Sequence, residues 1–596
     1  MATLKTRSEI EDKYKWRLED IYEDEKLWEE DYNKVKELLK EIVKFKGKIN
    51  TSKDLLSVLK LHDEIGIMAG KVFVYARMRR DEDNTNTKYQ ALADKAMRLN
   101  IEVMSTTSFI VPEILSIDTQ KLMEMINECE ELKIYQHYFE DLIRFKPHVL
   151  SPEEEKILAE AETIAESVSN IYTMLNNADM KFPTIKDENG EEVELTHGNF
   201  IRFMQSKDRN VRMAAFNAMY DTYEKFINTF SSTMAGNIKK DIFYAKTRKY
   251  NSSLEASLFE DNINVEVYDN LIETVHNRLN LLHRYVSLKK KLLGLYELHM
   301  YDLYVPLIQE YDKKFTYEEA LELVLEGLKP IGDEYISLLK KGFNSRWIDV
   351  YENRGKTSGA YSWGTYGTHP YVLLNYQGKL NDVFTIAHEM GHSLHTYYSN
   401  STQPYIYAGY KIFVAEVAST CNEALLMDYL LKNSKDEKEK LYLLNHFFEE
   451  FRGTIYRQVM FAEFEKYAHE IAEKGESITP EVLCKKYYDL NKLYYGDDIV
   501  VDEGISYEWA RIPHFYRNFY VYKYATGFSA AIAISQMILN EGEKAVQRYK
   551  EFLKSGSSDY PLNLLKKAGV DLTTPKPVNE ALDVFERLLD EFGKML

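Results

Sequence analysis

The fold class follows from the stretch Asn381-Asp382-Val383-Phe384-Thr385-Ile386-Ala387-His388-Glu389-Met390-Gly391-His392-Ser393-Leu394-His395. Its apolar residues recur with helical spacing on one face: Val383, Ile386, Ala387, Met390 and Leu394. The three histidines fall on another face, and Asn381 or Asp382 stands where a side-chain oxygen can cap the first turn. The stretch therefore predicts an amphipathic helix that carries its histidines on a separate face.

Residues 388–392 form the most specific motif of the chain. In an α-helix, positions four apart lie one turn apart on the same face, so His388 and His392 can both reach one cation. Glu389 flanks the same place, and this arrangement is typical of a zinc peptidase site. With 14 histidines in 596 residues, chance predicts on the order of a few hundredths of such a match. We therefore interpret the motif as functional.

A catalytic zinc ion usually takes three protein ligands, so a third ligand must lie downstream. His395 shares the face of His388, but one straight helix rarely surrounds a tetrahedral ion, and we expect His395 to support or pack near the site. The metzincin pattern is excluded because its glycine and third-histidine positions hold His395 and Tyr398. Acidic residues of the next predicted helix remain as candidates.

The next predicted helix, residues 411–423, carries Glu416 and Glu423 two turns apart on one face. A carboxylate inside an apolar helix is costly without a partner. Apolar residues surround Glu416, namely Ile412, Phe413, Val414, Ala415, Val417 and Ala418. A polar turn at 399–404 leaves room for this helix to return beside the first one. We predict that Glu416 is the third ligand and that Glu423 orients a ligand histidine, whereas ordinary exposed charges are the alternative.

These motifs resemble the oligoendopeptidase F group, which is related to thimet oligopeptidase among the zinc metallopeptidases. The resemblance covers nearly the whole chain and rests on the segments Tyr14–Tyr22, Lys181–Ile185, His388–His392, Phe413–Glu416 with Glu423, Ile512–Tyr516 and Phe519–Gly527. It implies one Zn2+ ion held by His388, His392 and Glu416, with Glu389 as the general base. Glu389 would accept a proton from water activated by the metal and pass it to the leaving amine.

The region 514–524 is expected to supply further groups. Tyr516, Tyr520 and Tyr524 recur every four residues and would share one face if this stretch is helical. Because the chain has 45 tyrosines, simple packing is a strong alternative. The resemblance implies catalytic contacts to the oxyanion by His514 and by Tyr520 or Tyr524, and a substrate contact by Tyr516. Which tyrosine acts stays open, because the thimet peptidases space these residues differently.

Two short extended segments, residues 358–364 and 370–376, precede the histidine helix in a chain that otherwise reads as helical. A peptide laid along such a strand satisfies its backbone groups while its side chains enter pockets. A small structural hairpin is the alternative, and the resemblance favours a substrate-binding edge that includes Gly359, Ala360 and Tyr361. We expect His369 to be a turn residue.

Length and composition predict lobes fused around one cavity. No Pro/Gly/Ser-rich linker or repeat divides the 596 residues, and 13 prolines with abundant Leu, Glu and Lys favour a mainly α fold. A helix is expected after Ser151-Pro152, and Asp187-Glu188-Asn189-Gly190 predicts a hairpin turn. We predict an amino-terminal helical lobe, 1–195, and a catalytic metallopeptidase domain, 196–596. By resemblance, they form a large two-lobed peptidase that encloses a deep substrate channel, with a small β-sheet next to the zinc helix.

The net charge of −19 argues against a nucleic-acid partner, because binding to a phosphate backbone needs basic surface. Cys129, Cys421 and Cys484 lack metal-type spacing, so we expect free thiols and a reducing, cytoplasmic setting. The amino-terminal residues are charged, and the apolar stretch 528–539 is too short to span a bilayer, so no membrane partner is expected. The sequence does not determine the oligomeric state.

The motifs together predict a zinc-dependent oligoendopeptidase that hydrolyses internal bonds of short peptides. One alternative is a zinc exopeptidase of carboxypeptidase type on a related helical scaffold, which needs a dedicated site for a terminal carboxylate or amine. Another is a non-catalytic peptide-binding protein. Glu389 argues against the latter, because a structural zinc site usually has four protein ligands and needs no base. The same donor set also accepts other divalent ions.

Overall fold

The fold is built almost entirely from helices. A computed structural model describes residues 4–308 and 313–595 of the chain. The structure is 73% helical with 3% strand, so the predicted mainly α class is confirmed. Its strands form short sheets of two or three members.

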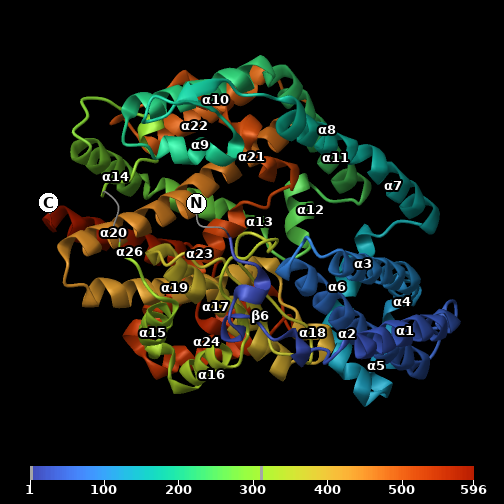
Figure 1. Cartoon of the computed structure of the whole chain (residues 1–596). Coiled ribbons are helices and arrows are strands. Elements are labelled where there is room, and N and C mark those ends of the chain that lie inside the picture. Colours follow the sequence, from blue (N-terminus) through green and yellow to red (C-terminus); the bar gives the residue numbers. More distant parts are fainter. Residues whose placement is uncertain (1–3, 309–312, 596) are drawn as a thin grey trace. The chain divides into compact units, whose positions relative to one another are not determined.

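The chain divides into two compact units, each assembled from three separate stretches (Figure 1). Their residues are 1–146, 312–430 and 534–570 in unit 1, and 147–311, 431–533 and 571–596 in unit 2. Two helices, α19 (Ile412–Asn433) and α23 (Tyr522–Glu541), contribute residues to both units. This division differs from the predicted one at 195/196, which stays a prediction.

Unit 1 contains the amino-terminal helices and those around the histidine motif. Besides its parts of α19 and α23, its helices are α1 (Glu25–Ile42), α2 (Ser52–Glu82), α3 (Thr87–Thr107), α4 (Ile110–Ser116), α5 (Thr119–Glu128), α6 (Gln136–Phe145), α15 (Tyr317–Gly327), α16 (Asp333–Asn344), α17 (Leu380–Thr402), α18 (Tyr405–Ala408), α24 (Glu543–Lys554) and α25 (Pro561–Ala568). The amino-terminal helices enclose the buried Trp16 and Trp28. The Trp28 Nε1–H donates to the Val72 carbonyl at 2.9 Å, which satisfies its buried polar group.

Unit 2 is a second helical body. Its helices are α7 (Pro152–Ala165), α8 (Ser167–Met174), α9 (His197–Met204), α10 (Arg209–Lys225), α11 (Ile227–Thr247), α12 (Ser253–Phe259), α13 (Val265–His276), α14 (Leu279–Leu292), α20 (Glu437–Glu450), α21 (Arg457–Glu473), α22 (Pro480–Tyr495) and α26 (Lys576–Met595). It also holds the antiparallel pair β1 (Thr184–Lys186) and β2 (Glu192–Glu194), and the parallel pair β3 (Leu298–His299) and β7 (Ile499–Val500).

The third sheet lies in unit 1 beside the histidine helix. It has the order β4-β6-β5, in which β4 (Ile348–Asp349) runs parallel to β6 (Tyr371–Leu373) and β5 (Tyr361–Trp363) runs antiparallel to it. The two predicted extended segments are therefore confirmed as strands, and β5 is an edge strand. The hydroxyls of Ser362 and Ser393 lie 2.8 Å apart, which joins β5 to α17.

Helix α17 begins at Leu380, so Asn381 and Asp382 lie inside its first turn and not at the predicted cap position. The Asp382 carboxylate accepts the backbone N–H groups of Gln377 and of the N-cap residue Lys379, which fixes the chain at the start of the helix. The helix continues to Thr402, so part of the polar turn predicted at 399–404 is helical. The Thr402 hydroxyl donates back to the Tyr398 carbonyl, as hydroxyl side chains in helices often do. The short helix α18 then precedes α19, and the sequence analysis did not predict it.

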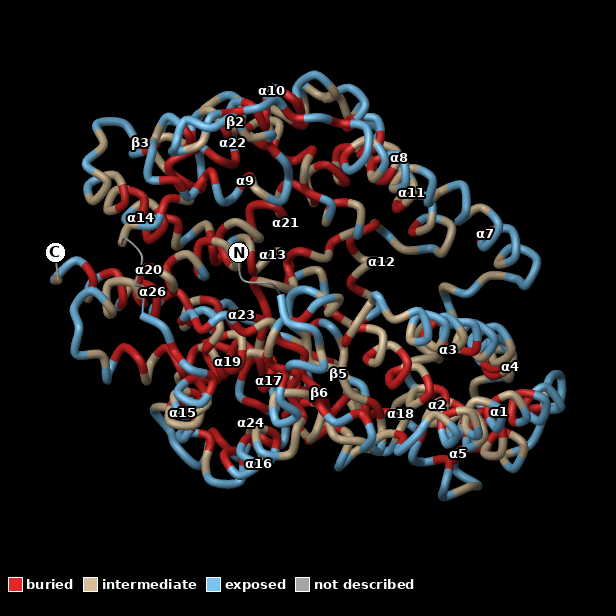
Figure 2. Tube along the Cα trace, in the orientation of Figure 1, coloured by how far each residue is buried: buried red, intermediate tan, exposed pale blue. Residues whose placement is uncertain are grey.

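The two local predictions for unit 2 are confirmed. Ser151 caps α7 through the Glu154 N–H, and the Asp187 carboxylate accepts the N–H groups of Asn189 and Glu191 in the β1–β2 turn. The apolar positions of α7 do not all face the core, because Ile157 is 66% exposed and Ile164 is 74% exposed. Figure 2 accordingly shows α7 largely in the colour of exposed residues.

Cys129, Cys421 and Cys484 are all free thiols, as expected. Within residues 4–308 and 313–595, the structure contains no helix with the length and apolar character that a bilayer crossing requires.

Candidate metal centre

A glycine allows the two helices of the candidate metal centre to pack closely. A Cβ added to Gly391 of α17 would lie 2.6 Å from the Ser419 Cα and 2.7 Å from the Ala418 carbonyl oxygen in α19. Real Cβ atoms do not approach backbone that closely, so a glycine is required for this packing of the two helices. The motif glycine therefore brings α17 and α19 together at the level of the two histidines.

A buried hydrogen bond ties the two helices together near the same level. The Asn422 Nδ2–H donates to the Ala387 carbonyl at 2.9 Å, and the Asn422 Oδ1 accepts the Tyr335 hydroxyl at 3.0 Å. Both bonds are shielded from water, so breaking either would leave a buried polar group unpaired. Asn422 thus sets the distance and the register between α17 and α19.

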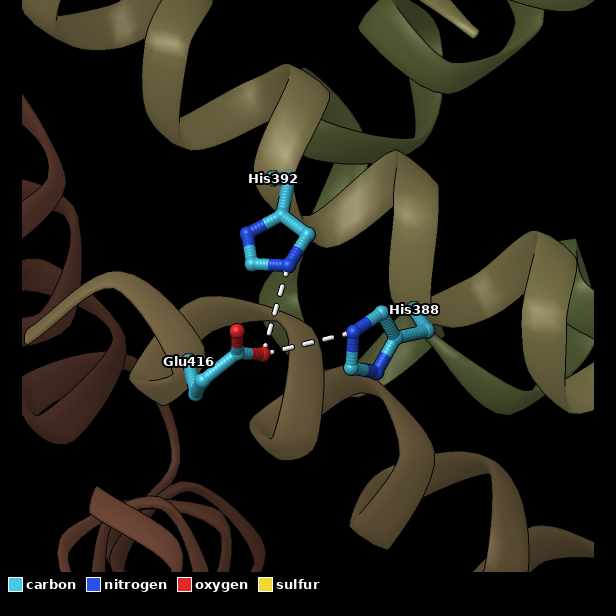
Figure 3. A group of neighbouring side chains, drawn as sticks. All are labelled: His388, His392 and Glu416. Carbon is cyan, nitrogen blue, oxygen red and sulfur yellow. Dashed lines mark ion pairs between the residues drawn. The ribbon is translucent and has the colours of Figure 1, made fainter. Parts of the chain in front are cut away.

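Three side chains converge at this contact (Figure 3). The Nε2 atoms of His388 and His392 each lie 3.3 Å from the same Glu416 Oε2 atom. The two imidazole rings stand almost perpendicular, with centroids 4.9 Å apart. Among the described residues, these three form the one group of His, Cys, Asp or Glu side chains with metal-ligand spacing. The structure therefore brings the three predicted ligands together.

The donor atoms fit a zinc ion in both chemistry and spacing. Two imidazole nitrogens and one carboxylate oxygen form a donor set typical of catalytic zinc. Bonds of about 2.0 Å at the tetrahedral angle place neighbouring donors about 3.3 Å apart, and both imidazole-to-carboxylate distances match that spacing. Three protein ligands leave one coordination position for water or substrate.

Glu416 is more exposed than the sequence analysis expected. Its side chain is 48% exposed, and Ile412, one turn earlier, is 57% exposed, although most other residues of α19 are buried. The premise that Glu416 lies buried among apolar residues was therefore wrong. Its position depends on specific partners, since the Ser419 hydroxyl donates to Glu416 Oε2 at 2.9 Å and both imidazoles face the same atom.

Glu423 lies on the other side of His388. Its Oε2 atom is 3.1 Å from the His388 Nδ1 atom, while the Nε2 atom of the ring faces Glu416. A carboxylate at Nδ1 selects the tautomer that leaves Nε2 free for a metal. Without a cation, hydrogen bonds to Glu416 and Glu423 outweigh burial and raise the pKa of His388 to about 11. A metal ion therefore competes with a proton for this imidazole.

Glu389 occupies the position between the two histidines in sequence and is only 8% exposed. Burial raises the pKa of its carboxyl, the nearby imidazoles lower it, and Glu416 and Glu423 raise it further. The net shift is upward. A carboxyl with a raised pKa is a better match for proton transfer near neutral pH than an ordinary glutamate.

His395 packs inside unit 1, as the sequence analysis expected. Its ring stacks on Tyr410 with centroids 3.8 Å apart and also contacts Phe552. Burial and the neighbouring His392 lower the pKa of His395 to about 3, so it is neutral at physiological pH. His369 likewise packs, with its ring stacked on Trp347 and its Nε2 atom 3.0 Å from the Asp20 carboxylate.

The predicted substrate edge borders a pocket next to α17. Gly359 has a φ of +82°, which favours glycine, and Tyr361 donates its hydroxyl to Asp81 at 2.9 Å. The pocket has a volume of about 230 Å³ and is lined by Gly359, Ala360, Leu374, Asn375, Tyr376, Asp382 and Thr385. Thr385 stands one turn before His388, so this pocket lies beside the histidine motif within unit 1.

The tyrosine region of unit 2 differs from the predicted single helix. A short 3₁₀ turn covers Pro513–Tyr516, residues 517–521 are not helical, and α23 starts at Tyr522. The spacing of four between the tyrosines therefore does not place them on one helix face, which corrects the prediction. The cause is a backbone reversal at Phe519, whose φ of +51° no helix interior allows.

His514, Tyr520 and Tyr524 nevertheless form a cluster. The His514 ring centroid lies 6.2 Å from that of Tyr520 and 6.0 Å from that of Tyr524, and the two tyrosine rings are 5.4 Å apart. Tyr516 faces another way, because its hydroxyl is 2.7 Å from the Thr233 hydroxyl and its ring stacks on Tyr172. The sequence analysis missed Glu465, which accepts the Phe519 N–H at 2.6 Å. No clear sequence signal marks it, because Glu463 and Lys466 stand beside it in α21.

Comparisons with known proteins agree with these features. Residues 202–584 match the family model Peptidase family M3, and residues 113–182 match the model Oligopeptidase F. The chain is 53% identical to Oligopeptidase PepF of Bacillus subtilis (strain 168), covering 100% of this chain and 89% of the relative. It is 44% identical to Group B oligopeptidase PepB of Streptococcus agalactiae, covering 99% of this chain and 98% of the relative.

Solved structures show the same fold. A crystal structure of oligoendopeptidase-F from Enterococcus faecium is 39% identical, covers 96% of this chain and 99% of its own, and has a TM-score of 0.74. A crystal structure from Chlamydophila abortus is 38% identical, covers 100% of both chains, and has a TM-score of 0.93.

Replacing the motif glycine should weaken the metal centre. In Gly391→Ala the new methyl group would collide with the Ser419 backbone, so α17 and α19 must separate, at a cost of about 1–3 kcal/mol of stability. We expect a lower melting temperature and less metal per chain, measured by thermal unfolding and elemental analysis. Gly593→Ala is the matched control, because its Cβ meets no atom within 4 Å. Normal metal content in Gly391→Ala would contradict the argument.

Removing the carboxylate behind His388 should reduce metal affinity without unfolding the protein. For Glu423→Ala we expect a loss of about 10–100-fold, the usual effect of deleting a partner that orients a ligand histidine. Affinity would be measured by competition with a chelator of known strength. His395→Phe should keep one metal per chain, since His395 only packs. Equal affinity in Glu423→Ala and wild type would remove Glu423 from the site.

Proposed function

Because the chain belongs to the oligopeptidase F group of peptidase family M3, and is thus a metallopeptidase with peptide substrates, we propose that it is a zinc-dependent oligoendopeptidase that hydrolyses internal bonds of short peptides. One observation carries this proposal: the donor atoms of His388, His392 and Glu416 converge at metal-ligand spacing beside the buried Glu389. A site of this kind leaves room for a substrate atom and provides a base next to it.

In this proposal, His388, His392 and Glu416 hold one Zn2+ ion, and Glu423 orients His388. A zinc ion in that donor set supplies a Lewis acid that makes water more acidic and polarises the peptide carbonyl. The spacing of the donors and the carboxylate at His388 Nδ1 support the assignment. A purely structural site would usually have four protein ligands.

Glu389 is the proposed general base. Its carboxylate takes a proton from the attacking water and then returns it to the nitrogen of the leaving amine. The buried position and the raised pKa of this carboxyl support both steps, because a base must hold the proton until it passes to the leaving amine.

His514 and Tyr520 or Tyr524 are the proposed donors to the oxyanion that develops on the scissile carbonyl. A tyrosine O–H group or a histidine N–H group stabilises such a charge when it is held in place before the charge develops. The mutual clustering of these three side chains supports a joint role. They belong to unit 2, and the metal ligands belong to unit 1.

Short peptides are the proposed partners, bound as an added strand along the edge formed by β5. Gly359 and Ala360 allow close backbone approach, Tyr361 begins the strand, and the adjoining pocket can accept a substrate side chain. Tyr516 is the proposed further substrate contact. The enclosed channel and the lobe boundary at 195/196 remain parts of this proposal.

The general base can be tested on a peptide that distinguishes endopeptidase from exopeptidase. Wild type and Glu389→Gln, both loaded with zinc and checked for equal metal content, would be given an internally quenched peptide blocked at both ends. We expect internal cleavage by wild type and a loss of about 10²–10⁴-fold in kcat for Glu389→Gln, the usual contribution of a general base. Mass spectrometry of the products locates the cleaved bond.

The outcomes separate the alternatives. If wild type with bound zinc cleaves only peptides with a free end, the carboxypeptidase-type reading replaces the endopeptidase. If it cleaves neither kind while still binding peptide, the protein is a peptide-binding module. Comparable rates for wild type and Glu389→Gln would exclude Glu389 as the base.

The oxyanion donors can be identified by removing one hydroxyl at a time. Tyr520→Phe and Tyr524→Phe keep the ring packing, so we expect the variant that lacks the true donor to lose about 10²–10³-fold in kcat with little change in KM. Tyr516→Phe should instead affect KM, if Tyr516 contacts substrate. Steady-state kinetics on the same quenched peptide provides the measurement. Unchanged kcat in both Tyr520→Phe and Tyr524→Phe would contradict a tyrosine donor.

A further inference from the structure

Residues 514–520 form a loop whose first and last side chains are partly exposed, whereas the side chains next to them are buried. His514 and Tyr520, at its two ends, are partly exposed. Phe515 and Phe519, next to them in sequence, are buried almost completely. The positions of the two outward side chains therefore depend on how the backbone at Phe515 and Phe519 is held.

The backbone at Phe519 has a conformation that a bulky residue rarely adopts. Its φ is +51°, in the left-handed region that favours glycine. Such a conformation persists only when surrounding contacts hold it. The Phe519 N–H donates to the Glu465 Oε1 atom at 2.6 Å, and the Phe519 ring packs on the His469 ring with centroids 4.5 Å apart. These contacts come from one turn of α21.

Glu465 is unusually placed for an acid. It is fully buried in α21, where its second oxygen has no hydrogen-bond partner among the described residues. Burial raises the pKa of Glu465 to about 8, against the opposing effects of His469 and the Phe519 N–H, and Asp241 adds to the rise. A buried acid of this kind is costly, so its direct bond to the strained residue suggests a specific use.

Buried side chains next to Glu465 hold the other end of the loop, at Phe515. The Asn237 Nδ2–H donates to the Phe515 carbonyl at 3.1 Å and to the Asp241 carboxylate at 3.3 Å. His469 connects the two sides, since its Nε2 atom lies 3.3 Å from Asp241 and its Nδ1 atom 2.9 Å from the Glu465 carbonyl. All of these residues belong to unit 2. Side chains of α11 and α21 thus hold both ends of the loop.

We propose that Glu465 is a positioning residue for peptide hydrolysis, which holds Tyr520 in its working place by binding the backbone N–H of Phe519. Asn237 performs the corresponding task for His514 through the Phe515 carbonyl. This inference rests on the proposed role of His514 and Tyr520 at the oxyanion. It adds a source for their alignment, because a donor helps only when it is held at the right place before the charge develops.

The test is a double-mutant cycle on kcat. Glu465→Leu removes the acceptor but keeps a buried side chain of similar size, whereas Glu465→Gln keeps a carbonyl oxygen for the Phe519 N–H. Each would be made alone and together with Tyr520→Phe. Glu463→Leu is the matched control, because Glu463 lies on the same helix but bonds His276, Lys486 and Tyr494 instead of the loop. All variants would be checked for zinc content and thermal stability.

We expect Glu465→Leu to lower kcat about 10–100-fold with KM nearly unchanged, since a misplaced donor loses much of its effect. Glu465→Gln should restore most of that loss. In the Tyr520→Phe background, Glu465→Leu should cost little more, because residues that act through one another are not additive. Glu463→Leu should lower stability but leave kcat near that of wild type.

Several results would overturn the proposal. If the fold losses in kcat of Glu465→Leu and Tyr520→Phe multiply in the double variant, Glu465 has only a structural role. The same conclusion holds if Glu463→Leu lowers kcat as much as Glu465→Leu does. If Tyr520→Phe alone has no effect, Tyr520 is not the oxyanion donor, and the positioning role of Glu465 fails with it. Should Glu465→Leu not fold, hydrogen exchange of wild type with residue-level fragmentation decides the matter: the Phe519 amide must be protected like the interior of α21. Exchange at the rate of an open loop refutes the bond to Glu465.

Discussion

The close approach of α17 and α19 at Gly391 is the constraint on which the candidate metal centre depends. Two histidines one turn apart define a line along α17, but a third donor has to come from another helix at a set distance. The backbone contact at Ser419 and the bond from Asn422 to the Ala387 carbonyl set that distance. Without them, Glu416 would be one more exposed carboxylate on a helix surface.

Much of this centre could be predicted because its signals are local. The spacing of His388 and His392 and the strand pattern of 361–363 and 371–373 need only the regular geometry of helices and strands. Glu416 does lie beside the two histidines, as predicted, although the reason given for choosing it was partly wrong. Its neighbours suggested deep burial, whereas its carboxylate is half exposed and is held by specific partners.

The prediction of one helix face for the three tyrosines was wrong for a physical reason that sequence spacing cannot reveal. Residues four apart predict a helix only if the backbone between them is free to be helical, and Phe519 is held in a left-handed conformation by Glu465. That partner lies 54 residues away in sequence. The division into two units of three stretches each is hidden from the linear sequence for the same reason, since contacts distant along the chain decide it.

The two clusters use acidic side chains in a similar way. In unit 1, the partly exposed Glu423 faces the Nδ1 atom of His388. In unit 2, Glu465 binds a backbone N–H next to a half-exposed tyrosine. Glu423 contacts the ring of the partly exposed His388, and Glu465 contacts the residue next to the partly exposed Tyr520. Because taking a carboxylate out of water costs stability, we infer that each of these two acids aligns its neighbour. Rigid support of this kind is what metal binding and oxyanion stabilisation both require.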